Sequence, residues 1–158
     1  MSAAGRAAAT GPGTILVVED SPTQAEALRA LLEDGGYRVL VARSGEEALA
    51  LAPAEAATVA LVLSDVVMPG MSGFDLCRAI KRDPALRGRP VVLLTSLSDP
   101  LDIIRGLEAG ADNYITKPYD PEHLLARLRQ VLDTRALRQV PTADGGVPAP
   151  DHLDYALV

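Results

Sequence analysis

The chain has 158 residues, of which 48% are hydrophobic, with no Trp and one Phe, which predicts a single domain with an aliphatic core of the α/β type. The formal charge of -6 argues against direct, sequence-independent binding to nucleic acid, which needs clustered Lys and Arg. The single Cys77 excludes an intramolecular disulfide framework and fits a cytoplasmic location. No apolar run approaches the roughly 20 residues of a membrane span, so no membrane insertion is expected.

The predicted elements alternate between strand and helix along the chain. Short apolar runs rich in Val, Ile and Leu predict the strands, and Ser or Asp beside Pro or Gly marks the start of most helices. In chain order the strands are expected over residues 14–18, 37–42, 59–64, 91–95 and 112–117. The helices that follow them are expected over residues 21–35, 44–53, 72–83, 98–110 and 120–138.

This alternation predicts a doubly wound, five-stranded parallel sheet with five helices on its two faces. Each crossover is long enough for a right-handed parallel connection. We assign residues 14–138 to this domain. The composition of the two ends predicts a disordered leader over residues 1–13 and a flexible tail or linker over residues 139–158.

The third strand ends on a carboxylate, Asp65, in what is expected to be a loop, because Pro69-Gly70 prevents the strand from continuing. In an open parallel sheet the carboxyl ends of all strands share one edge, where ligands bind. The other strands end at Glu19-Asp20, Thr95 and Lys117. Three carboxylates at one site repel one another unless a cation is present, and Mg²⁺ with its oxygen ligands satisfies this requirement.

Such a site suits phosphoryl transfer, which needs mainly positioning and neutralisation of charge. A carboxylate accepts a phosphoryl group to form an acyl phosphate, so Asp65 is the candidate acceptor. We expect Asp20 to hold Mg²⁺ directly and Glu19 to hold it directly or through water. Lys117 would place its ammonium beside a phosphoryl oxygen, and Thr95 would donate its hydroxyl.

The chain resembles the receiver domains of two-component response regulators over residues 14 to about 135. The residues that carry this resemblance are Glu19-Asp20, residues 64–70, Leu94-Thr95-Ser96 and residues 114–118. The resemblance implies a flavodoxin-like fold and Mg-dependent phosphorylation of Asp65 by a sensor histidine kinase or a histidine phosphotransfer protein. It also implies that the Val67 backbone carbonyl is a metal ligand and that the bond before Pro118 is cis.

The resemblance also implies a switch that a downstream protein target reads. On phosphorylation, Thr95 would move toward the phosphoryl group and Tyr114 would turn inward, which changes the surface of the fourth helix, fifth strand and fifth helix. The resemblance is also compatible with a homodimer through that surface. The domain would assist its own phosphorylation and dephosphorylation without being a conventional enzyme. Residues 18–24 and 95–100 look most like receivers associated with hybrid sensor kinases.

Other interpretations of these residues stay open at the level of the sequence. Glu19 and Asp20 are also suited to capping the first helix, and Tyr114 to plain core packing. One alternative function is a receiver-like interaction module that needs no phosphorylation. Another is a phosphatase or phosphotransferase that acts on small metabolites, but such enzymes carry a second acid two residues after the nucleophile, where this chain has Val67.

Overall fold

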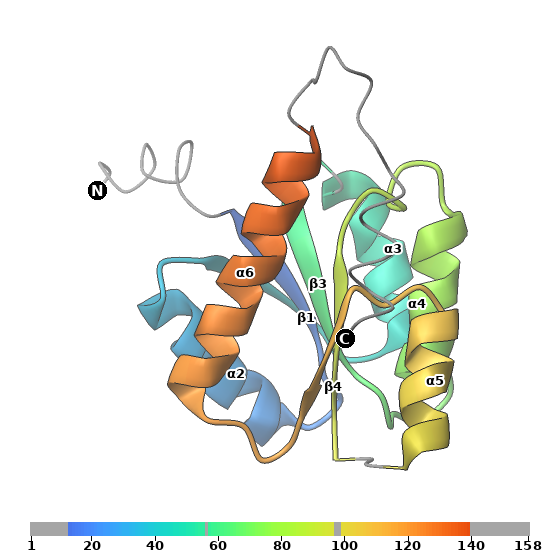
Figure 1. Cartoon of the computed structure of the whole chain (residues 1–158), viewed down its shortest axis with the longest axis horizontal. Coiled ribbons are helices and arrows are strands. Elements are labelled where there is room, and N and C mark those ends of the chain that lie inside the picture. The colour runs from blue at the N-terminus through green and yellow to red at the C-terminus, as the bar shows by residue number, and fades with distance from the viewer. Residues whose placement is uncertain (1–12, 56, 97–98, 140–158) are drawn as a thin grey trace.

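The computed structural model describes residues 13–55, 57–96 and 99–139. The predicted tail beyond Gln139 and the predicted leader before Gly13 lie outside them. Ten elements alternate along the chain (Figure 1): β1 (Thr14–Val18), α2 (Pro22–Asp34), β2 (Arg38–Ala42), α3 (Gly45–Glu55), β3 (Val59–Asp65), α4 (Gly73–Arg82), β4 (Val91–Thr95), α5 (Pro100–Glu108), β5 (Asn113–Thr116) and α6 (Pro121–Gln139).

The five strands form one parallel sheet in the order β2-β1-β3-β4-β5. β3 is therefore the central strand, with β1 on one side and β4 on the other. This order confirms the predicted five-stranded parallel sheet with five helices. Each strand is joined to the next by a helix, as parallel pairing requires.

Helices cover both faces of the sheet (Figure 1). α2 and α6 lie on one face, and α3, α4 and α5 lie on the other. β1 shows why its sequence is continuously apolar: Ile15 and Val17 pack toward α2 and α6, whereas Leu16 and Val18 pack toward α3 and α4. A strand buried on both faces has no polar alternation.

Local sequence signals start the helices as expected. The Ser21 hydroxyl accepts a hydrogen bond from the Gln24 N–H at 3.3 Å, and Pro22 occupies the first turn of α2. Ser72 and Asp75 form a capping box at the start of α4. These caps fix where the helices begin, directly after the loops that carry the strand-end residues.

Several predicted boundaries were wrong by a few residues. Asp65 is the last residue of β3 and not a loop residue, because its pairing with Leu94 extends the ladder. α3 continues through Pro53 to Glu55, since a proline near the end of a helix removes one hydrogen bond without ending the helix at once. β5 begins only at Asn113, and the preceding Asp112 carboxylate accepts a hydrogen bond from the Val91 N–H at 2.8 Å.

None of the helices in the described part of the chain is both long enough and apolar enough to cross a membrane.

Candidate functional site

Three carboxylates meet at the carboxyl edge of the sheet. β1 and β3 are neighbours with Val18 opposite Ser64, so the residues that end these strands lie side by side. Glu19, Asp20 and Asp65 each offer an oxygen atom, and these atoms all lie within 4.8 Å of one another. The sequence placed these residues at one edge, and the structure brings them into one cluster.

Glu19 is the buried member of this cluster, with only 1% of its surface exposed. One carboxylate oxygen, Oε2, accepts a hydrogen bond from the Ser21 N–H at 3.1 Å. The other, Oε1, is buried without a hydrogen-bond partner. Burial raises the pKa of Glu19; the Ser21 N–H and the Lys117 charge oppose this shift, whereas the charges of Asp65 and Asp20 add to it.

Asp65 is held in a fixed orientation by the chain that follows it. Its Oδ1 atom accepts a hydrogen bond from the Val66 N–H at 2.9 Å. The loop then folds back, and the Gly73 N–H donates to the Val66 carbonyl at 2.8 Å. A Cβ atom at Gly73 would clash with the Asp65 carbonyl oxygen, so only glycine fits there. Within this loop the Val67 side chain is exposed, and the predicted ligand role of its carbonyl stays a prediction.

Lys117 brings a positive charge to the acidic cluster. Its Nζ atom lies 3.3 Å from Asp65 Oδ2 and 3.7 Å from Glu19 Oε1. The Lys117 backbone N–H donates to the Thr95 carbonyl at 2.7 Å, which continues the pairing of β4 and β5 beyond Thr116. The peptide bond between Lys117 and Pro118 is cis, as the resemblance implies.

Gln24 is a residue near the site that the sequence reasoning missed. Its Oε1 atom accepts a hydrogen bond of 2.9 Å from Lys117 Nζ. The available signal was its place in the first turn of α2, three residues after the Ser21 cap and beside the Glu19-Asp20 pair. Glutamine at such a position usually indicates only an exposed helix surface, so this signal was too weak to select it.

Thr95 and Tyr114 lie on the α5 side of the acidic cluster. Thr95 is fully buried at the end of β4, and Tyr114 lies opposite Leu93 on β5. The Tyr114 ring packs against the core on the side of α5. It lies so close to Gly106 of α5 that a Cβ atom added to this glycine would be 3.1 Å from the ring. Burial raises the pKa of Tyr114, the charge of Asp102 adds to this shift, and the Thr95 side chain opposes it.

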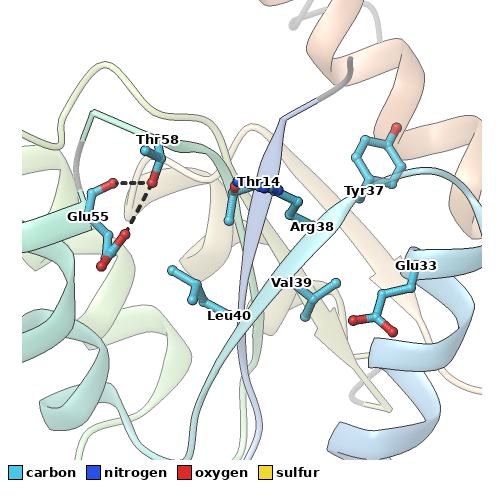
Figure 2. Close-up of a pocket in the computed structure, with 8 residues that line it drawn as sticks. All are labelled: Thr14, Glu33, Tyr37, Arg38, Val39, Leu40, Glu55 and Thr58. Carbon is cyan, nitrogen blue, oxygen red and sulfur yellow. Dashed lines mark hydrogen bonds between the residues drawn. The ribbon is translucent and has the colours of Figure 1, made fainter. Parts of the chain in front are cut away.

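Two pockets of about 420 Å³ lie at opposite ends of the strands. One adjoins the acidic cluster and is lined by Leu28, Leu94, Tyr119 and other residues that include Lys117. The other surrounds the first residues of β1 and β2 at the amino edge of the sheet (Figure 2). There the Thr58 hydroxyl donates to two oxygens of Glu55, and Figure 2 shows Glu33 on the opposite side of β2. Of these two pockets, the one lined by Lys117 lies beside the acidic cluster.

Comparison with protein families gives a match to the response regulator receiver domain over residues 15–129. The chain belongs to this family. The match covers the sheet from Ile15 onward, the acidic cluster, Lys117 and the part of α6 up to residue 129. This confirms the family resemblance and the receiver function that the resemblance implied.

Named relatives of this receiver domain include two response regulators. The chain is 42% identical over 115 residues to the DNA-binding response regulator MtrA of Mycolicibacterium smegmatis, covering 73% of this chain and 48% of MtrA. It is 44% identical over 117 residues to the response regulator PleD of Caulobacter vibrioides, covering 74% of this chain and 25% of PleD. The chain thus spans half or less of the length of these two relatives.

A solved structure with a similar fold is the signal receiver domain of a signal transduction histidine kinase from Syntrophus aciditrophicus. It is 45% identical in sequence with a TM-score of 0.73, and the match covers 82% of this chain and 97% of that one. Receivers from response regulators and from a histidine kinase are therefore both among the relatives of this domain.

Proposed function

We propose that Asp65 accepts a phosphoryl group from the phosphohistidine of a sensor histidine kinase or a histidine phosphotransfer protein, in a reaction that requires Mg²⁺. The observation that carries this proposal is the cluster of Glu19, Asp20 and Asp65 beside the Lys117 ammonium. In the transfer, a bond from an Asp65 carboxylate oxygen to phosphorus forms as the bond from the histidine nitrogen to phosphorus breaks. The nitrogen keeps the electron pair of the broken bond.

The donor set of the acidic cluster fits Mg²⁺. Three carboxylates place oxygen atoms within 4.8 Å of one another, and Glu19 Oε1 is a buried oxygen that lacks a hydrogen-bond partner, a costly arrangement that a cation would relieve. We assign Asp20 and Asp65 as direct ligands, Glu19 as a ligand either directly or through water, and the Val67 carbonyl as a further ligand. When bound, Mg²⁺ would neutralise negative charge on the phosphoryl oxygens.

The remaining residues orient the reacting groups and respond to the new phosphoryl group. The hydrogen bond from the Val66 N–H orients the Asp65 carboxylate, and Lys117 is close enough to pair with a phosphoryl oxygen. In this way the domain assists its own phosphorylation and dephosphorylation. Thr95 would follow the new phosphoryl group and Tyr114 would respond to it, which changes the surface of α5, β5 and α6.

The partners in this proposal are proteins. The name of MtrA describes that longer protein as DNA-binding, whereas this chain spans 48% of its length. We infer that the receiver domain itself makes no direct contact with nucleic acid, because the chain carries a formal charge of -6. A kinase or phosphotransfer protein would dock beside Asp65, a downstream protein target would bind the α5, β5 and α6 surface, and the setting would be cytoplasmic.

The test is incubation of the protein with acetyl phosphate and Mg²⁺, with covalent phosphorylation followed by intact mass. We expect one phosphoryl group on the wild type, none on Asp65→Asn, and none on the wild type when EDTA removes the metal. Asp65→Asn is the matched control because it keeps the shape of the side chain but removes the nucleophilic carboxylate. If the wild type takes no phosphoryl group, a phosphorylation-independent interaction module becomes the better interpretation.

A further inference from the structure

We propose that Gln24 is a positioning residue for Lys117: its amide oxygen holds the ammonium beside Asp65 and keeps it from being drawn into the carboxylate cluster where the metal binds. This inference rests on the proposed phosphorylation of Asp65. It assigns a role in that reaction to a side chain from α2 that is not among the predicted phosphorylation, metal or switch residues.

The contacts of Lys117 Nζ carry the proposal. The hydrogen bond from Lys117 Nζ to Gln24 Oε1 is 2.9 Å long, whereas the distances to Asp65 Oδ2 and Glu19 Oε1 are 3.3 and 3.7 Å. An ammonium has three N–H donors and no acceptor, so it is the amide oxygen of Gln24 that faces it. The neutral residue thus makes a closer contact than either of the two carboxylates.

Gln24 is itself anchored to the acidic site through the cap of α2. Its backbone N–H donates to the Ser21 hydroxyl at 3.3 Å, and the Ser21 N–H donates to Glu19 Oε2 at 3.1 Å. A continuous set of contacts therefore runs from Glu19 through Ser21 and Gln24 to Lys117, and Lys117 in turn contacts Glu19 and Asp65. These contacts fix the position of the Gln24 amide relative to the carboxylates of Glu19 and Asp65.

The physical need for such a residue follows from the charges. Lys117 has a long, flexible side chain, and its head group lies close to the carboxylates of Asp65 and Glu19, which cluster with that of Asp20. Without a competing acceptor, the ammonium would move further toward those carboxylates and occupy space that Mg²⁺ requires. The neutral oxygen of Gln24 holds the ammonium in place without adding negative charge near the incoming phosphoryl group.

The test uses acetyl phosphate with Mg²⁺ and measures the rate constant for phosphorylation of the intact protein. Gln24→Met keeps the length of the side chain but removes the acceptor, and we expect the rate constant to fall about three- to tenfold, the range for losing one hydrogen bond to a charged group at a partly exposed site. The matched control is Thr23→Val, which removes a polar group from the neighbouring exposed position, and we expect it to react at the wild-type rate.

A second measurement separates positioning from a merely structural role. In a Lys117→Met background, Gln24→Met should lower the rate no further, because the group that Gln24 positions is gone. The free energy of unfolding in urea should be the same for Gln24→Met and Thr23→Val. Additive rate effects in the two backgrounds would overturn the inference.

The outcomes distinguish this inference from the proposed function. If the wild type is phosphorylated and Gln24→Met reacts at the same rate, the inference fails and the proposed function stands. If the wild type takes no phosphoryl group at all, the proposed function fails and the inference fails with it.

Discussion

At the scale of the residue, burial sets the charge state of Cys77. Its side chain is fully buried in α4, and its Sγ atom donates to the Ala109 carbonyl at 3.4 Å. Burial raises the pKa of the Cys77 thiol from 9.0 to about 11. As the pH rises from 9.0 toward 11, the unfolded chain therefore loses this proton while the folded chain keeps it. The contribution of Cys77 to stability is complete below pH 9.0 and falls as the pH rises through that interval.

This shift gives a prediction for Cys77→Ala. The free energy of unfolding of the wild type should fall more steeply with pH than that of the variant, by up to about 1.4 kcal/mol per pH unit. Urea unfolding of both proteins at several alkaline pH values measures the difference. The loss of core volume in the variant lowers its stability equally at all pH values, so only the slope is diagnostic. Parallel slopes would show that the thiol is not protected by the fold.

At the scale of the element, α5 is shaped to accept Tyr114 from β5. A Cβ atom at Gly106 would lie 3.1 Å from the Tyr114 ring and 3.3 Å from Leu93 Cδ1. Alanine is favoured over glycine in a helix by about 1 kcal/mol, but here the methyl group would press on packed neighbours. We expect Gly106→Ala to lower the free energy of unfolding by about 1 kcal/mol, because overpacking outweighs helix propensity.

The same substitution should change sign when the ring is absent. In a Tyr114→Ala background the methyl group has room, so Gly106→Ala should raise the free energy of unfolding by about 1 kcal/mol, the gain in helix propensity. Urea unfolding of the four proteins provides the comparison. An equal effect in both backgrounds would mean that the close approach of α5 and Tyr114 does not determine the choice of glycine.

At the scale of the whole molecule, α5 presents an apolar surface that the described part of the chain leaves exposed. Leu101, Ile104 and Leu107 are 65%, 47% and 60% exposed, although each is a large hydrophobic residue. Contiguous exposed apolar residues of this kind often mark interaction surfaces. We expect beryllofluoride with Mg²⁺ to increase the dimer fraction of the wild type in sedimentation equilibrium, through the α5, β5 and α6 surface.

Leu107→Asp is the variant that tests this dimer. It should remove the increase in dimer fraction, because it buries a charge in the apolar contact, while leaving beryllofluoride binding at Asp65 intact. A wild type that stays monomeric with beryllofluoride bound would contradict the prediction. A variant that still dimerises would place the contact elsewhere on the surface.

The sequence by itself determined the order of the elements, the parallel sheet and the edge at which the polar residues collect. Apolar runs and helix caps are local signals, and the carboxyl ends of parallel strands must share an edge whatever the side chains do. Asp65, Glu19, Asp20, Thr95 and Lys117 were therefore predictable as a group. The boundaries were less predictable, because they depend on contacts with neighbouring strands, such as the pairing of Asp65 with Leu94 and the hydrogen bond from the Val91 N–H to Asp112.

Only the tertiary structure decided how these residues contact one another. The hydrogen bond between Lys117 and Gln24 joins residues 93 positions apart, and no local pattern distinguishes that glutamine from any other on a helix surface. The burial of Glu19 and the packing of Tyr114 against Gly106 likewise depend on distances between elements. Periodicity reports which face of an element is buried, whereas the charge and position of a side chain depend on the atoms that the whole fold places around it.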